Sequence, residues 1–577
     1  MEGSLARLLA WRLAERPELG FLFVQDDGPW SFERLAAAAV RLGERMDAVR
    51  PGDRVVVRVG NDERFLPALC AVWCRRAAAV VMHPAAPADE VARVVAAMEA
   101  TGLICAPEDP AATGTQIGPV GVPTWLFDRF DPAGDSASDS ATAARYRPPT
   151  EDVGDTPALV LLTSGSTGEP KGVPLTHNNA WSNLRATVSA FRRDTNPTPL
   201  ADESKPPNLI ANPLSHTAGV VRLLFALYVG RRVALLRKFD GRAAKRLLDR
   251  HRIDNLTINP AMLRILLDTL EPGEDLGAVR YVSSGTAPLT TALREEFEAR
   301  FGVPVLQAYG QTEAFGGISI ESARDVLAGR RRPGSVGRAL PGVELRLVRS
   351  DGTEAPVGEE GEIRVRSRSA TSGYLTAGGE HSPVDADGWL RTGDLGTLDE
   401  DGYLYITGRL KNIIICGGFN VVPEEVEAAL AADPTVREAA VFGVPDERLG
   451  ELPVALVVGP ADSERVAQHV HPRLAPYKRP RRIFVVDELP RVPNGKVDRP
   501  KAQAMARALA AEAGSVSDDS SKDRSDGSSG RPPATAGPVG AGPGGVGSAG
   551  VGSAGVGSAG VGSAGVGRGG AGRAGAR

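Results

Sequence analysis

The sequence predicts a layered α/β protein of more than one domain, and three observations support this fold class. The chain has 577 residues, of which 42% are hydrophobic and 24% charged, as expected for a globular protein with two or more domains. Helical and strand patterns alternate over residues 4–110, which is typical of α/β layers. Short alternating strands with glycine-rich turns over 334–427 predict a small β subdomain, and the strand patterns beyond it predict a compact α+β domain ending near residue 512.

The first third of the chain supplies scaffold elements. Ser31 is placed to cap a helix over 32–46, and residues 54–59 are predicted to form a strand after a turn at 51–53. Residues 131–155, rich in Asp, Ser, Ala, Thr and Pro, are predicted to form a surface loop. Nothing in this third of the chain indicates chemistry.

Composition and charge exclude several classes of function. The net charge of −4 carries no signature of nucleic-acid binding. No apolar run is long enough to span a membrane, and the N-terminus is a charged amphipathic segment without a cleavable signal pattern. The four cysteines predict neither a disulfide framework nor a zinc site, and Cys70 and Cys74 are expected in the core of a helix. A cytoplasmic location is therefore expected.

A glycine- and hydroxyl-rich loop follows a buried strand predicted over 158–162. Glycines let the backbone approach a ligand, hydroxyls and amides offer donors to anionic oxygens, and a lysine adds a cation, so the loop suits a polyphosphate. A Walker P-loop is excluded because Pro170, not glycine, precedes Lys171. Apolar residues recurring at helical spacing over 180–191 predict that the loop joins a strand to a helix. The loop residues are Thr163, Ser164, Gly165, Ser166, Thr167 and Gly168.

Five further segments contain polar residues that could belong to a functional site, although each residue alone has an ordinary structural explanation. His216 could be a core histidine, Asp394 a turn residue, and Arg409 and Lys496 solvated surface cations. The segments are NPLSHTAGVV (212–221), SSGTAPL (283–289), QAYGQTEAFGG (307–317), the 387–427 region with DGWLRTGDLG and DGYLYITGRLKN, and PRVPNGKVDR (490–499).

Together and in this order, over roughly residues 4–512, these motifs resemble the adenylate-forming superfamily, which includes acyl-CoA synthetases, stand-alone adenylation domains and luciferases. The resemblance implies a large domain over 1–408 and a smaller, mobile C-terminal domain over 409–512. It implies that a carboxylic acid reacts with ATP to give an acyl-adenylate, and that a thiol, most simply that of coenzyme A, then displaces AMP.

The resemblance also implies roles for individual residues. The loop and Lys171 would hold phosphates, Glu313 beside Thr312 would bind Mg²⁺, and Lys496 would be the catalytic lysine. His216 would line the acyl pocket, Lys411 would be the hinge, and Gly417 and Gly418 would border the thiol path. The residues expected around adenine and ribose are Gly285, Thr286, Ala287, Tyr309, Gly310, Asp394 and Arg409.

The substrate and the acceptor stay open at this point. Residues 212–221 contain no acidic side chain to pair with a substrate ammonium, which argues against an α-amino acid. Small and apolar residues in 216–221 and 314–317 favour an uncharged acyl or aryl group. A stand-alone enzyme that loads a separate carrier protein would share every motif. A nucleotide-binding protein without activity is disfavoured because Glu313 and Lys496 are both retained.

The C-terminal residues 513–577 have a different composition. Valines at 546, 551, 556, 561 and 566 mark a Gly-Val-Gly-Ser-Ala repeat, which offers too little apolar surface to offset the entropy of ordering, so disorder is predicted. Residues 545–550 match the dinucleotide fingerprint literally, but no strand or helix pattern flanks them. The match therefore gives no support for a dehydrogenase.

Overall fold

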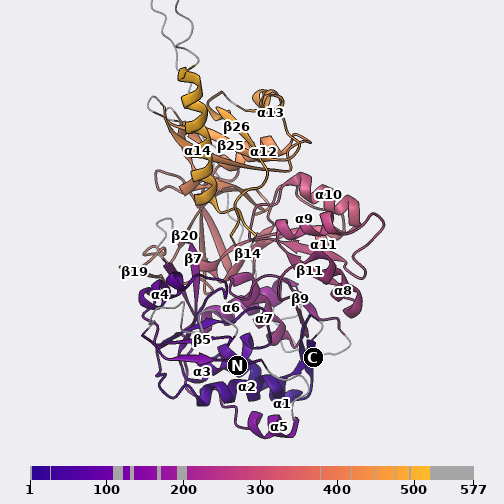
Figure 1. Ribbon diagram of the computed structural model, residues 1–577, viewed down its shortest axis with the longest axis vertical. Coiled ribbons are helices and arrows are strands. Elements are labelled where there is room, and N and C mark those ends of the chain that lie inside the picture. The colour runs from indigo at the N-terminus through magenta and orange to yellow at the C-terminus, as the bar shows by residue number, and fades with distance from the viewer. Residues whose placement is uncertain are drawn as a thin grey trace, which may run out of the picture. The chain divides into compact units, whose positions relative to one another are not determined.

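The computed structural model describes residues 3–25, 27–107, 121–129, 136–164, 170–191, 205–376, 378–416, 419–446, 449–474, 476–492 and 495–519. Residues through Ser517 belong to one compact unit, which contains every element discussed below except the end of the last helix (Figure 1). The fold is mixed α/β with a small β subdomain and a smaller C-terminal α+β part, as the sequence predicts. No helix in the described ranges is both long and apolar enough to cross a membrane.

An eight-stranded sheet carries the first predicted strands and the glycine-rich loop, in the order β19-β18-β8-β7-β4-β3-β5-β6. Strands β7, β4, β3, β5 and β6 run parallel, whereas β8 is antiparallel to β7. The bounds are β3 Arg54–Arg58, β4 Ala78–Val81, β5 Gly102–Cys105, β6 Thr124–Leu126, β7 Pro157–Ser164, β8 Pro170–Thr176, β18 Tyr374–Thr376 and β19 Gly379–His381.

The glycine-rich loop joins two strands, so the prediction that it joins a strand to a helix is wrong. Residues Pro170–Thr176 form β8 because Val173 and Leu175 alternate into the core, which is a strand pattern. Helix α6 (His177–Phe191) begins only after this strand. The loop is thus the connection of an antiparallel hairpin, and residues 165–169 themselves lie outside the described residues.

Helices cover both faces of the eight-stranded sheet because its central strands bury side chains on both sides. Val55 and Val57 join the larger core cluster, whereas Val56 joins another with helix α4 (Ala88–Ala97). Ser31 caps α2, accepting a hydrogen bond from the backbone N–H of Arg34 at 3.2 Å, as predicted. The larger cluster includes residues of α1 (Ala6–Glu15), α2 (Phe32–Glu44), α3 (Phe65–Cys74), α6 and α7 (Thr217–Val229).

Two details of the first third bear on the sequence analysis. Cys70 is buried and Cys74 half-buried in α3, and both are free thiols, which confirms their core role. The predicted loop over 131–155 contains helix α5 (Ser136–Ala143), so that prediction is wrong over these residues. Asp139 of this helix is buried and pairs with Arg41 and Arg34 of α2, a long-range contact that loop composition does not reveal.

Two mixed sheets continue the large domain, and the second carries two of the predicted motifs, at 283–289 and 307–317. Their orders are β2-β1-β10-β9 and β11-β12-β13-β14-β15, and the described helices α8, α9 and α10 share one core with them. The strand bounds are β1 Gly20–Val24, β2 Asp27–Ser31, β9 Asn208–Ile210, β10 Val233–Leu235, β11 Asn255–Ile258, β12 Tyr281–Ser284, β13 Val305–Gln311, β14 Gly316–Ile320 and β15 Arg338–Ala339. The helices are α8 Gly241–His251, α9 Pro260–Thr269, α10 Thr291–Phe301 and α11 Ala323–Leu327.

The predicted β subdomain is an antiparallel sheet of four strands, β16-β17-β20-β21. Its inner face buries alternating apolar side chains such as Ile363, Val365 and Leu404. The strands are β16 Val343–Val348, β17 Gly361–Ser367, β20 Leu390–Leu398 and β21 Leu404–Arg409. Three-residue 3₁₀ turns, η1 (Thr312–Ala314) and η2 (Leu410–Asn412), follow β13 and β21.

The C-terminal part is a sheet with helices on both faces (Figure 1). Helices α12 (Pro423–Ala431) and α13 (Ser463–Val470) share one core cluster with it, and α14 (Arg499–Asp519) shares the other. Helix α14 extends to Asp519, past residue 512 where the sequence places the end of this domain. The strands are β22 Ile414–Cys416, β23 Phe419–Val421, β24 Glu438–Asp446, β25 Gly450–Val458 and β26 Arg482–Val486, as expected for the predicted α+β fold.

Gly310 allows β13 and β14 to pair closely at a bulge, and this close approach predicts the effect of adding a methyl group. A Cβ at position 310 would clash with the carbonyl oxygen of Gly316. Gly310→Ala should therefore destabilise the protein by about 1–3 kcal/mol, the usual range for overpacking. In Gly43→Ala, the matched control in α2, the nearest atom to the new Cβ is 4.0 Å away, and stability should hold or rise. Equal thermal midpoints for the two variants would contradict this expectation.

Candidate active site

Asp394 contacts two of the predicted site residues, Arg409 from the same segment of the sequence and Tyr309 from an earlier one. It is 2% exposed, and it sits opposite Arg409 in the pairing of β20 with β21. Arg409 Nε lies 2.6 Å from one carboxylate oxygen, and the Tyr309 hydroxyl donates to the other at 2.7 Å. Burial, and then the Asp394 charge, raise the pKa of Tyr309 well above its usual value. Of the residues predicted to contact adenine and ribose, Tyr309, Asp394 and Arg409 therefore form one connected group.

Glu313 and Lys171 are linked through a tyrosine that the sequence analysis missed. The Tyr374 hydroxyl donates to Glu313 Oε1 at 2.9 Å, and Lys171 Nζ lies 3.2 Å above the Tyr374 ring. Burial lowers the pKa of Lys171, and the charge of Glu313 opposes this shift. Tyr374 has no motif around it in the sequence. Only the pairing of β18 with β8 brings it beside Lys171.

Two lysines from outside the large sheets add their charges to this group. The pKa of Lys496 is lowered to about 8, first by loss of surrounding water and then by Arg409, while Asp394 and Glu313 oppose the shift. The Lys496 side chain is nevertheless exposed to solvent, so protein atoms surround it only in part. Burial likewise lowers the pKa of Lys411 in η2, followed by the charge of Arg409. The predicted hinge lysine thus also lies in the electrostatic field of the site.

The charges of the site do not balance. Four cations, Lys171, Arg409, Lys411 and Lys496, interact with the two carboxylates of Glu313 and Asp394. An excess of positive charge around a partly desolvated site attracts and holds anions. The group is therefore suited to a ligand that carries several negative charges.

His216 is neutral and has an unused nitrogen. It caps helix α7 through its backbone, and its Nε2 is buried without a hydrogen-bond partner among the described residues. Burial, followed by the charges of His83 and Lys496, lowers its pKa to about 4. The next residue, Thr217, shares a hydrogen bond of 2.7 Å with Thr312 of the predicted metal motif. His216 is therefore not a core histidine whose two ring nitrogens both have hydrogen-bond partners in the described part of the chain.

The segment predicted to edge adenine is tightly built. Thr286 has a left-handed backbone with φ of +70°, a strained state for a β-branched residue that is common at functional sites. A Cβ on Gly285 would lie 2.9 Å from the carbonyl oxygen of Ala308 in β13, so the backbones approach closely here. Ala287 is half-buried beside them. Adenine binding by these residues stays a prediction.

The remaining predicted residues divide into two groups. Thr163 is the second-last residue of β7, with its hydroxyl 3.5 Å from the Lys171 carbonyl oxygen, and Ser164 at the end of the strand pairs with Pro170. Asn412, next to the predicted hinge residue Lys411, donates a hydrogen bond to Glu424 of α12 at 3.1 Å, and so links η2 to that helix. Outside the described residues lie Gly165, Ser166, Thr167, Gly168, Gly417 and Gly418.

The part of the chain that the structure describes contains no cluster of three or more His, Cys, Asp or Glu side chains suited to a metal ion. Glu313 is therefore a single carboxylate beside an excess of positive charge. Magnesium commonly uses one or two carboxylates together with substrate phosphates, so this donor set fits that ion.

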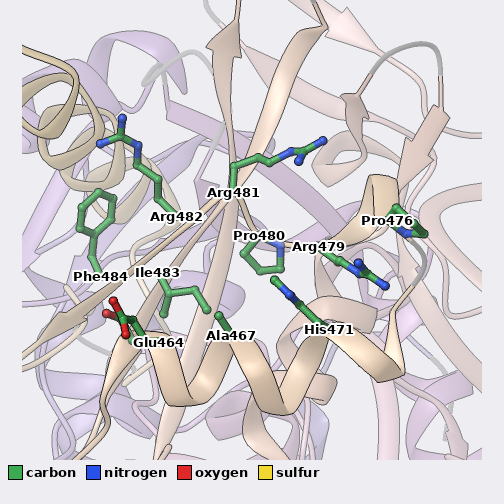
Figure 2. Close-up of a pocket in the computed structure, with 11 residues that line it drawn as sticks. Glu464, Ala467, His471, Pro476, Arg479, Pro480, Arg481, Arg482, Ile483 and Phe484 are labelled. Atoms are coloured by element: carbon green, nitrogen blue, oxygen red, sulfur yellow. The ribbon is translucent and has the colours of Figure 1, made fainter. Parts of the chain in front are cut away.

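A second basic region lies in the C-terminal part, in a hollow of about 490 Å³ next to α13 and β26 (Figure 2). Arg479 and His471 lie at one side, Arg481 extends above them, and Glu464 lies at the opposite side. The Arg481 side chain is exposed and forms no ion pair with any residue described. The sequence analysis missed this hollow, although the arginines at 479, 481 and 482 are a visible basic run.

The fold and the site define a nucleotide-using enzyme, and the comparisons with known proteins agree. Residues 9–375 match the AMP-binding enzyme family, and residues 425–496 match the AMP-binding enzyme C-terminal domain. The chain belongs to this family. It is an AMP-forming acid–thiol ligase, as the sequence predicts.

The relatives match along most of this chain. A sulfoacetate–CoA ligase from Cupriavidus necator is 34% identical over 512 residues, covering 86% of this chain and 97% of that protein. ATP-bound MatB from Rhodopseudomonas palustris superposes with a TM-score of 0.76 at 29% identity, covering 88% and 100% of the two chains. An o-succinylbenzoate coenzyme A synthetase from Bacillus subtilis, solved with ATP and magnesium, has a TM-score of 0.72 at 27% identity, covering 87% and 99%.

The lowered pKa of Lys496 predicts a pH dependence for ATP–pyrophosphate exchange. The ammonium is present below about pH 8 in the free enzyme and is lost as the pH rises through that value. The value of kcat/KM should therefore fall with rising pH in this range. In Lys496→Arg, whose guanidinium stays protonated, any remaining activity should persist to higher pH. The same alkaline decline in both proteins would show that another group titrates.

Proposed function

We propose that the protein converts a carboxylic acid to its coenzyme A thioester in two steps at the site around Asp394 and Glu313. A carboxylate oxygen attacks the α-phosphorus of ATP, and the bond to pyrophosphate breaks. The thiolate of coenzyme A then attacks the acyl carbonyl, and AMP leaves with the bonding electrons. The observation that supports this proposal most directly is the excess of cations around these two carboxylates, namely Lys171, Arg409, Lys411 and Lys496.

The main physical task is to bring an anion to a polyanion. Catalysis of phosphoryl and nucleotidyl transfer is mostly positioning and electrostatic stabilisation. Lys171 and the loop at 163–168 would hold the departing pyrophosphate, and Asp394 with Arg409 would hold the ribose. Lys496 would lie between the carboxylate and the α-phosphate, where negative charge builds. His216, neutral at physiological pH, would border the acyl group without adding charge.

Glu313 would hold Mg²⁺ together with phosphate oxygens, and the ion would neutralise part of the phosphate charge. The hydrogen bond from Tyr374 fixes one carboxylate oxygen and so orients Glu313. The hydrogen bond between the hydroxyls of Thr312 and Thr217 fixes the turn that carries Glu313. The synthetase from Bacillus subtilis that was solved with ATP and magnesium supports this assignment.

The second step requires a path for the thiol. Lys411 would be the hinge about which the 409–512 domain turns, and Gly417 and Gly418 would border the pantetheine path. A cytoplasmic location, where ATP and coenzyme A are both available, completes the proposal.

The basic hollow favours coenzyme A over a carrier protein as the acceptor. Coenzyme A carries several phosphate charges, and Arg479 and Arg481 offer guanidinium groups that bind phosphates well. A carrier protein remains the second candidate because it presents the same thiol. Release of AMP with free coenzyme A, compared with release in the presence of candidate carrier proteins, separates the two.

Lys496→Ala should abolish adenylate formation but leave thioester formation from supplied acyl-adenylate largely intact. Removing a charge that acts on the transition state typically costs 10²- to 10³-fold or more in rate. ATP–pyrophosphate exchange measures the first step, and acyl-CoA formation from synthetic acyl-AMP measures the second. Lys501→Ala removes an exposed lysine from the same domain and should leave both rates unchanged. Equal loss of both steps in Lys496→Ala would refute the assigned role.

Arg481→Gln should raise the KM for coenzyme A by roughly 10-fold, the scale of one charge-assisted contact. The rate of ATP–pyrophosphate exchange should not change, because that step does not use coenzyme A. Arg246→Gln, which removes an exposed arginine from α8, serves as the control for net charge. An unchanged KM in Arg481→Gln would exclude a coenzyme A contact at this arginine.

A further inference from the structure

One face of helix α7 is accessible in an otherwise buried helix. Thr217, Gly219, Val220, Leu223, Leu224 and the residues from Ala226 to Val229 are buried. The partly exposed residues recur at positions i, i+3, i+4 and i+7, which lie on one side of a helix. They are Ala218, Val221, Arg222 and Phe225, here called the α7 stripe.

The stripe lies beside the active site. Thr217 bonds to Thr312, and a Cβ on Gly316, at the end of the Thr312–Ala314 turn, would lie 3.5 Å from Val221. Helix α7 also contacts α1, α6, β9 and β14, so neighbours surround it on several sides (Figure 1). The partly exposed stripe therefore starts two residues after His216 and runs along the helix. This is the direction in which the acyl group of a substrate would extend.

Arg222 is a cation without a counter-ion. Among the described residues it forms no ion pair and no hydrogen bond. Its only titratable neighbour is Tyr281, a phenol at the start of β12, and burial lowers the arginine pKa to about 10. Two of the buried arginines have carboxylate partners, and the side chains of Arg58 and Arg294 donate hydrogen bonds to neutral oxygens. Arg12 pairs with Glu15 at 2.7 Å and Arg64 with Asp62 at 2.6 Å.

An unpaired, poorly hydrated guanidinium is costly to keep. The cost is offset when a ligand brings the missing negative charge, and a guanidinium is well shaped to bind carboxylate or sulfonate oxygens. Arg222 is therefore better explained as part of a binding site than as part of the core.

We infer that Arg222 binds a second anionic group at the far end of the acid substrate. The substrate class is then acids with a distal carboxylate or sulfonate, rather than the uncharged acids that the apolar residues 216–221 favour. Arg222 lies six positions after His216, or roughly 9 Å along the helix, and helical side chains lean toward the N-terminus. A short aliphatic spacer between the two anionic groups fits this reach. The inference rests on the proposed ligase function.

The test compares acids of equal length with and without the distal charge. Glutarate is paired with pentanoate, adipate with hexanoate, and 4-sulfobutanoate serves as the sulfonate member. AMP release with coenzyme A gives kcat/KM for each acid. The wild type should prefer the anionic member of a pair by about 10- to 100-fold, the range for a hydrogen-bonded charge.

Arg222→Gln should remove this preference, with a higher KM for the anionic acids and unchanged values for the neutral ones. Arg222→Lys, which keeps the charge, should restore part of the preference. Arg246→Gln on the exposed face of α8 should behave as wild type. As a second readout, the anionic acids should raise the thermal midpoint of the wild type but not that of Arg222→Gln.

Three outcomes overturn the inference. Preference of the wild type for neutral acids would show that Arg222 meets no substrate anion, while the ligase function would stand. An equal effect of Arg222→Gln on all acids, together with a lower thermal midpoint, would assign the arginine to folding. Failure of every acid to release AMP would refute the proposed function itself, and this inference with it.

Discussion

The burial of Asp394 is the constraint on which the site depends. A carboxylate that is 2% exposed must have partners, because an uncompensated buried charge costs several kcal/mol. The register of β20 with β21 supplies Arg409, and strand β13 supplies the Tyr309 hydroxyl. This one group therefore ties the β subdomain to the sheet that carries Glu313. Any shift between the two would separate the residues expected to bind the ribose from those expected to bind the metal.

The excess of positive charge determines which kind of ligand the site attracts. Internal ion pairs elsewhere in the chain neutralise arginines such as Arg12 and Arg64, but the lysines around Glu313 and Asp394 exceed the available carboxylates. Loss of surrounding water, and then the charge of Arg409, lower the pKa values of Lys411 and Lys496, and a bound polyanion would offset the repulsion between the cations. The perturbed lysines are thus what a site prepared for ATP should contain. By the same argument, we infer that the unpaired charge of Arg222 is neutralised by a smaller anion.

Features outside the motifs carry the specificity. Family membership accounts for ATP and AMP, yet relatives named for sulfoacetate and for o-succinylbenzoate share the fold, so the fold does not choose the acid. Arg222 of the α7 stripe and Arg481 beside α13 have no ion-pair partner among the described residues. We expect these side chains to lie where substrates bring the missing negative charge.

Local patterns by themselves determined much of this protein. The cap at Ser31, the strand at 54–58, the existence of the β subdomain and the order of the motifs all follow from short-range periodicity and residue type. Only the tertiary structure decided that the loop at 165–169 joins two strands and that Tyr374 connects Lys171 to Glu313. It also decided that Arg222 has no counter-ion among the described residues. These features depend on contacts between segments far apart in the chain, and periodicity within a short window carries no information about them.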